Sequence, residues 1–170
     1  MSGLFSFPNP VNETSARIVA GGAVAMSVAF VLTGNGWVLA ALTYGFIARV
    51  LSGPTFSPLG RLATQVLTPR IRAQHRFVPG PPKRFAQGIG AAMSSAASVL
   101  YVQDAVTAAR VVIAGLAVAA FLEAAFALCL GCKIFSVLMR IGVIPASVCE
   151  ECNDISSRLR ATSEDQAQTV

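Results

Sequence analysis

Long uncharged stretches separated by short polar segments dominate the chain. Residues 18–48 and 85–103 carry no charge, and residues 111–132 carry a single one, at Glu123. A helix that crosses the hydrocarbon core of a bilayer needs about 20 mainly apolar residues. The first stretch is too long for one helix, and the turn-forming segment TGNGW at residues 33–37 divides it. The pattern predicts four transmembrane helices, near residues 17–33, 36–52, 84–103 and 108–134.

The fold class expected from this pattern is all-α: a polytopic membrane protein with four transmembrane helices and a short cytoplasmic C-terminal helix. Composition supports it, because 54% of the residues are hydrophobic and only 12% are charged, against about 25% charged residues in soluble domains. A soluble bundle would need a polar face on each helix, and these segments provide none. We expect three parts: a leader (1–16), a membrane domain (17–142) with a basic loop at 53–84, and a tail (143–170).

Positive charge is concentrated between the second and third predicted helices. The loop at 53–84 contains six arginines and lysines and no acidic residue. The positive-inside rule predicts that such a loop stays in the cytoplasm, and two helical hairpins then place both termini there too. We therefore expect a multi-pass protein of the plasma membrane. The net charge of +5 indicates this orientation and an affinity for anionic lipid. Nucleic-acid binding is not expected, because the basic residues lack aromatic or base-reading neighbours.

All four cysteines lie in two C-x-x-C pairs. The first pair, Cys129 and Cys132, falls near the predicted cytoplasmic end of the fourth helix. Apolar surroundings raise the pKa of a thiol, and the negative end of a helix dipole raises it further. This pair is therefore expected to be a buried, protonated dithiol that needs a partner for activation.

The second pair, Cys149 and Cys152, lies in the polar tail. Ser147 stands three residues before Glu150, which is the spacing of a capping box at a helix start. Free backbone N–H groups at such a start stabilise a thiolate. Cys149 is therefore expected to be the most reactive of the four cysteines, with Cys152 as its resolving thiol.

Two other interpretations of the cysteines stay open. The spacing C-x2-C-x16-C-x2-C falls within the range typical of zinc sites, so all four could bind Zn²⁺ in a non-enzymatic membrane scaffold. The members of this alternative metal site would be Cys129, Cys132, Cys149 and Cys152. Alternatively, the cysteines of the fourth helix act only as small hydrophobic residues.

Glu123 is the other candidate for chemistry. A carboxylate near the bilayer centre costs about 2.5 kcal/mol or more, so an ionisable residue there is by default a functional hypothesis. We expect it to be protonated or hydrogen-bonded to Ser94, Ser95 or Ser98 of the third helix. A structural role is as plausible as a place in the pathway of a small sulfur-species carrier, which would require a homo-oligomer.

Four segments of the sequence resemble a known family. NPVNETSARIVAG, GPTFSPLGRL, GPPKRFAQGIG and FLEAAFALCLGCKIF are similar to the bacterial membrane family called domain of unknown function 4395, of the actinobacterial type. The likeness spans roughly residues 8–140. It implies a small polytopic membrane protein, in actinobacteria often encoded near thioredoxin-like and sulfurtransferase genes. The resemblance favours sulfur or thiol chemistry over zinc and carries over Cys129 and Cys132 as functional residues.

The leading hypothesis is a membrane thiol-redox or sulfur-handling protein without a cofactor. Cys149 and Cys152 would react with a thioredoxin-like protein or a sulfurtransferase, and would pass electrons or sulfur to Cys129 and Cys132. Any enzymatic activity would then be thiol–disulfide exchange or sulfur transfer.

Overall fold

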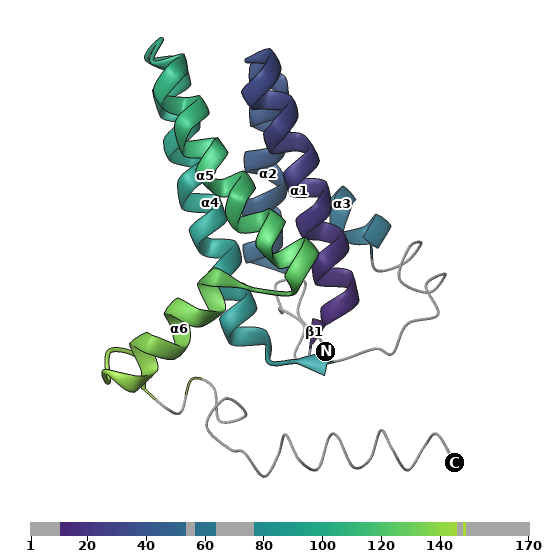
Figure 1. The fold of residues 1–170 in the computed structure, drawn as a ribbon, viewed down its shortest axis with the longest axis vertical. Coiled ribbons are helices and arrows are strands. Elements are labelled where there is room, and N and C mark those ends of the chain that lie inside the picture. The colour runs from purple at the N-terminus through teal and green to yellow at the C-terminus, as the bar shows by residue number, and fades with distance from the viewer. Residues whose placement is uncertain (1–10, 54–56, 64–76, 146–147, 149–170) are drawn as a thin grey trace.

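The computed structural model describes residues 11–53, 57–63, 77–145 and 148. Within them the chain forms helices and one short pair of strands (Figure 1). In chain order the elements are β1 (Val11–Asn12), α1 (Glu13–Thr33), α2 (Gly36–Ser52), α3 (Pro58–Arg61), β2 (Phe77–Val78), α4 (Gly80–Val102), α5 (Val106–Phe126) and α6 (Leu130–Arg140).

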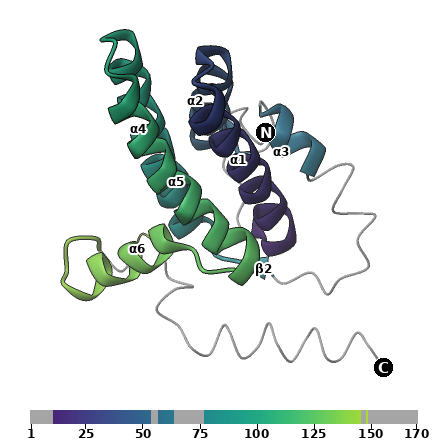
Figure 2. The same ribbon diagram turned by 45° about the horizontal axis from the view of Figure 1, so that its top comes forward.

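The four long helices form an up-down-up-down bundle. Helix α1 packs against α2 and α5, and α4 packs against the same two helices from the other side. The hairpins α1–α2 and α4–α5 are visible as two adjacent columns in Figures 1 and 2. The core is apolar, with Phe30, Leu42 and Ile113 fully buried. We call the end where α1 and α4 begin and α2 and α5 end the α6 end, because α6 leaves the bundle there.

The turn between α1 and α2 is the one expected from TGNGW. Gly34 ends α1 in the left-handed conformation, with φ of 66°, which glycine adopts without steric penalty. Asn35 then caps α2, because its side-chain oxygen accepts a hydrogen bond from the backbone N–H of Trp37 at 2.9 Å. The division of the first apolar stretch into two helices is therefore confirmed.

Helix α4 begins earlier than predicted, at Gly80 instead of residue 84. Pro81 and Pro82 lie in its first turn, where a missing N–H group breaks no helical hydrogen bond. Just before it, β2 pairs with β1 in an antiparallel register of Val11 with Val78. This strand pair, which the hydrophobic pattern did not predict, joins the start of α1 to the start of α4.

Three helices, α1, α4 and α5, are long and apolar enough to cross a membrane. Helix α2 is equally apolar but has 17 residues. Small residues allow close packing of the helices, as at Gly90 of α4, where an added Cβ would overlap the ring of Phe46. The described part of the chain therefore has the character of a helical membrane protein.

The predicted helix at 108–134 is wrong in its last part. Helix α5 ends at Phe126, and Ala127 adopts the left-handed conformation with φ of 56°. Its N–H group bonds to the carbonyl of Glu123 at 3.0 Å, and that of Leu128 bonds to Leu122 at 3.2 Å. These bonds satisfy carbonyls that a helix end leaves without partners. The chain then starts the separate helix α6, which runs sideways from the bundle in both ribbon views (Figures 1 and 2).

Candidate functional site

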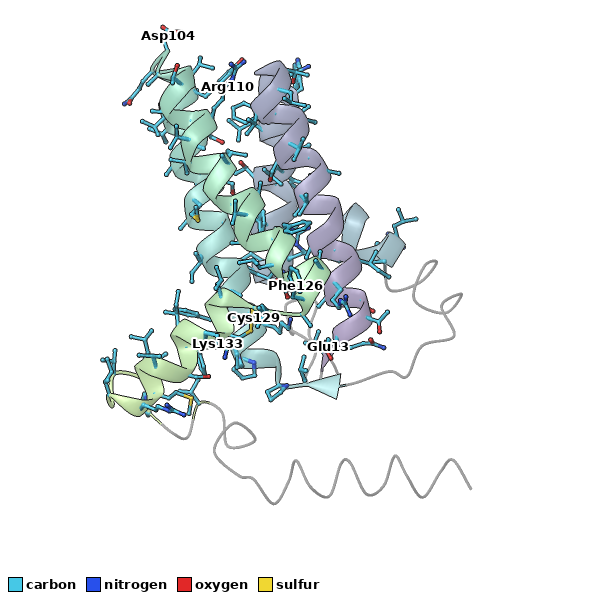
Figure 3. All side chains as sticks on the ribbon, in the orientation of Figure 1. Glu13, Asp104, Arg110, Phe126, Cys129 and Lys133 are labelled. Atoms are coloured by element: carbon cyan, nitrogen blue, oxygen red, sulfur yellow. A yellow bond between two sulfur atoms is a disulfide. The ribbon has the colours of Figure 1, made fainter. Side chains whose placement is uncertain are left out.

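The first cysteine pair forms a disulfide, Cys129–Cys132, at the start of α6. The two Cα atoms are 5.2 Å apart, which lies within the usual range for a bridged pair. Figure 3 shows Cys129 at the α6 end of the bundle, just beyond the end of α5. The two sulfurs are thus bonded to each other, whereas we expected a dithiol from the sequence.

Cys129 occupies the N-cap position of α6. Its sulfur accepts a hydrogen bond from the backbone N–H of Cys132 at 3.3 Å. The positive end of a helix dipole stabilises a thiolate, so the dipole acts here in the opposite direction to the one expected at the end of a long helix. The expectation failed because it depended on an unbroken fourth helix.

The two cysteine residues differ in exposure. Cys129 is 8% exposed, whereas Cys132 is half-buried. The predicted burial of the pair is therefore confirmed for Cys129 and wrong for Cys132. An attacking thiol has better access to residue 132.

The first turns of α6 are held against the start of α4. Gly131 lies so close to α4 that an added Cβ would be 2.6 Å from the Cα of Ala86, and the rings of Phe85 and Phe135 have their centroids 5.6 Å apart. A glycine between the cysteines is needed because no side chain fits between the two backbones. Gly131, between the two cysteines, is therefore held against Ala86, which lies about one helical turn after Lys83 on α4.

Lys83 forms an ion pair with Glu123, with 2.5 Å between Nζ and Oε1. The side chains are 10% and 15% exposed. Glu123 lies in the last turn of α5 and not near the centre of a membrane helix, because α5 ends three residues later. Its partner is therefore Lys83 at the start of α4 and not one of the serines that we expected. Of these serines, Ser98 bonds to Thr43 and to the backbone carbonyl of Ser94.

Arg49 of α2 is a second buried cation beside this pair, with an exposed fraction of 4%. Its guanidinium donates to Gln87 Oε1 at 3.0 Å and to Ser57 Oγ at 3.4 Å. We call Ser57, Arg49, Lys83, Gln87 and Glu123 the basal polar cluster. It contains two buried cations and one carboxylate; Glu123 pairs with Lys83, whereas Arg49 is hydrogen-bonded to the neutral side chains of Gln87 and Ser57.

Arg17 stabilises the neighbouring end of α5. Its Nε and Nη2 atoms donate to the carbonyls of Ala124 and Ala125, each at 3.0 Å. A cation at this position also offsets the partial negative charge of the helix C-terminus. The end of α5 is therefore held from α1 through Arg17 and from α4 through Lys83.

Our sequence analysis missed the partners of Glu123 and the role of Arg17. One signal was available: Arg17 and Arg49 border the uncharged stretch 18–48, Lys83 lies two residues before the stretch 85–103, and Glu123 is the single charged residue of 111–132. A single internal carboxylate pairs most simply with a cation at the boundary of a neighbouring helix. The break at Ala127, in contrast, has no glycine or proline to mark it.

The predicted second pair, Cys149 and Cys152, lies outside the described residues, as do Ser147 and Glu150 of the predicted helix start. Among the residues that the structure describes, no three His, Cys, Asp or Glu side chains are grouped as a metal site would require. Sulfurs joined in a disulfide are not thiolate ligands. Zinc binding by all four cysteines would therefore first require reduction of Cys129–Cys132.

Comparison with known proteins identifies one relationship. No curated protein and no solved structure matches the chain. The family model described as domain of unknown function (DUF4395) matches residues 11–140. The match includes all four bundle helices, the basal polar cluster, the first cysteine pair and the whole of α6. The chain therefore belongs to the family of proteins with domain of unknown function 4395.

Proposed function

We propose that the protein is a membrane thiol–disulfide exchange protein whose reactive group is the Cys129–Cys132 bond. The observation that carries this proposal is the position of the bond in the first turn of α6, where Cys129 caps the helix. A thiolate released from Cys129 would be stabilised by the backbone N–H groups of that turn. A purely structural disulfide between residues three apart would add little, because the loop that it closes is short.

The proposed reaction exchanges one disulfide for another. A thiolate of a dithiol partner attacks Sγ of Cys132, and the bond to Cys129 breaks, so that Cys129 leaves as a thiolate. The second thiolate of the partner then attacks the partner's own sulfur in the mixed disulfide and releases Cys132. Cys129 and Cys132 gain two electrons and end as a dithiol, while the partner ends as a disulfide. The reverse sequence oxidises the pair again.

The partner that we propose is a cytosolic thioredoxin-like protein or a sulfurtransferase that reacts directly with Cys132. Cys149 and Cys152 of the tail would provide a second, intramolecular route from the same partner to Cys132. Support comes from the chain itself, which carries a second C-x-x-C pair close in sequence to the first. In the sulfur-transfer version, the bond is first reduced by a dithiol partner as above. The Cys132 thiolate then attacks the outer sulfur of a cysteine persulfide on the sulfurtransferase, and the cysteine of that enzyme leaves as a thiolate.

This function is tested by exchange with reduced thioredoxin as the probe. The protein is purified in its oxidised form, reconstituted in vesicles and carries Cys149→Ser and Cys152→Ser, so that one disulfide remains. Reduced thioredoxin should convert that disulfide into two alkylatable thiols per chain, and a Cys129→Ala, Cys132→Ala version is the matched control. A bond that reacts only after denaturation would contradict the proposal. Stoichiometric zinc in the purified wild-type protein, lost on replacing any of its four cysteines, would favour the scaffold instead.

We further propose that all four long helices span the plasma membrane, with the α6 end in the cytoplasm. Helix α2 has 17 residues, which is about 26 Å at 1.5 Å per residue and at the lower limit for a span. It packs against both α1 and α4 in the bundle. The charges support the orientation, because Arg17, Arg49, Lys83 and Arg84 lie near the α6 end, whereas Asp104 and Arg110 lie at the other (Figure 3).

Reporter fusions test this topology. Fusions after Gly80 and after Val170 should be active only as cytoplasmic reporters, whereas a fusion after Asn35 should be active only as an external reporter. External activity of the Val170 fusion would mean that the orientation is the opposite of the proposed one, or that the number of membrane spans is not four. It would also remove the cytosolic partner from the proposed reaction.

A further inference from the structure

Helix α6 has three distinct sides. The side with Gly131 and Phe135 is buried against α4. A second side is polar and exposed, with Lys133, Ser136 and Arg140. A third side is apolar but also exposed, and we call it the α6 stripe. Its residues are Leu130, Ile134, Val137 and Ile141, with exposed fractions between 44% and 65%.

The α6 stripe is a continuous surface along the helix. Its residues follow one another at intervals of four, three and four, the spacing that keeps side chains on one side of an α-helix. Four large aliphatic side chains exposed in a row are unfavourable in water, since each loses about 1.5–3 kcal/mol relative to a buried position. The stripe therefore requires an apolar partner.

Its position next to the membrane domain indicates what that partner is. The stripe begins directly after Phe126 and Leu128, which are also large, apolar and exposed, at 64% and 45%. Phe126 is the last residue of α5, one of the helices that is long and apolar enough to cross a membrane, and Leu128 follows two residues later. Exposed apolar side chains thus continue along the chain from the end of α5 to the start of α6.

The charges of α6 fit a lipid surface as well. Lys133 and Arg140 are exposed, and the helix contains no acidic residue. They border the stripe, as basic residues do in helices that lie in a membrane interface with the apolar face among the acyl chains. The helix also runs sideways from the bundle in both ribbon views (Figures 1 and 2) and not along its axis.

We propose that α6 is an interfacial helix bound to anionic lipid of the leaflet at its end of the bundle. The α6 stripe lies at the boundary between headgroups and acyl chains, while Lys133 and Arg140 bind lipid phosphates. This placement depends on the membrane character of the bundle and not on the thiol chemistry proposed above. It adds a location for the disulfide, which is then held at the membrane surface.

The test places a fluorescent probe on two neighbouring positions of α6. Trp37 is the sole tryptophan and lies at the opposite end of the bundle, so Trp37→Phe gives a background without fluorescence from tryptophan. Into it we introduce Val137→Trp on the stripe or, as the matched control, Ser136→Trp on the polar side. Both full-length proteins are reconstituted in vesicles of phosphatidylcholine with or without phosphatidylglycerol, and brominated lipids serve as quenchers.

The expected result is strong quenching of the tryptophan at position 137 by lipid bromines near the headgroups, and weak quenching at position 136. Acrylamide, a water-soluble quencher, should show the reverse order. Adding Lys133→Gln and Arg140→Gln should lower the ratio of inserted to water-exposed α6 roughly fivefold per charge in the anionic vesicles, with little effect in neutral ones.

Two results would overturn the inference. If position 137 is shielded from acrylamide but not quenched by brominated lipid, the stripe is covered by protein, either the tail of this chain or a second copy. If positions 136 and 137 are equally open to acrylamide, the stripe has no partner at all. Because neither readout involves the cysteines, failure here is separate from failure of thiol exchange.

Discussion

Replacing Glu123 by glutamine should lower the free energy of unfolding by about 3–5 kcal/mol, the usual effect of removing one partner of a buried ion pair. Glu123 pairs with Lys83, and Lys83 and Arg49 are both buried. The variant would leave two buried positive charges with no carboxylate among the described members of the basal polar cluster. Glutamine keeps the size of the side chain, so the effect reports charge and not a cavity.

The measurement is unfolding in mixed detergent micelles followed by circular dichroism. Arg84→Gln is the control, because it removes a neighbouring but exposed cation whose Nε bonds to the carbonyl of Val50, and it should change the free energy by less than about 1 kcal/mol. The double variant Lys83→Met, Glu123→Leu should recover much of the lost stability, since apolar residues of similar volume replace buried pairs well.

This experiment also separates the two interpretations of Glu123. If Glu123→Gln is as stable as the wild-type protein yet loses thiol exchange, the carboxylate has a chemical role. Loss of stability in Glu123→Gln and its recovery in the double variant, with exchange intact, would assign Glu123 a structural role. We expect the second result.

Glutathione disulfide should modify the cysteine at position 132 at least roughly tenfold faster than the one at position 129, because access limits thiol–disulfide exchange. The comparison uses Cys129→Ser and Cys132→Ser, each in the reduced protein with Cys149→Ser and Cys152→Ser, so that each chain has one cysteine. Cys132 is half-buried, whereas Cys129 is 8% exposed. In the reaction, the remaining thiolate attacks one sulfur of glutathione disulfide and releases one glutathione thiolate.

Mass spectrometry after acid quenching gives both rates. The adduct on Cys132 should also persist, because Cys129→Ser lacks the thiol that would displace it. Denatured in urea, the two variants should react at similar rates, which controls for the intrinsic reactivity of the thiols. Faster modification of Cys129 in the folded protein would mean that stabilisation of its thiolate by α6 outweighs burial, and that exchange begins at Cys129.

The hairpins of the bundle could be predicted because their signals are local. A long apolar stretch with Gly34 and Asn35 in its middle can form two helices and a turn, whatever the rest of the chain does. The break between α5 and α6 could not be predicted in this way. Ala127 has no intrinsic preference for the left-handed conformation that it adopts, and the contact of Gly131 with Ala86 depends on tertiary packing.

The sequence predicted which cysteines belong to the candidate site, but not their position on a helix or the contacts around them. The C-x-x-C spacing identified Cys129 and Cys132 as a pair, but the chemical environment of the sulfurs depends on which end of a helix holds them. One misplaced helix boundary therefore reversed the expected effect of the dipole on Cys129. The pairing of Lys83 with Glu123 joins residues far apart in the chain, and local periodicity carries no information about such contacts.

The strand pair β1–β2 has a consequence for the order of assembly during synthesis. Val11 and Asn12 are made before α1, but their partners Phe77 and Val78 follow α2 and α3. The ribosome adds residues one after another, at about 5–20 per second. The residues of the first hairpin are therefore synthesised roughly 1–5 seconds before β1 can pair, and β2 is made immediately before α4. Pairing of the strands then brings the start of the second hairpin to the start of the first, so that α4 enters the bundle at a position that β1 has already defined.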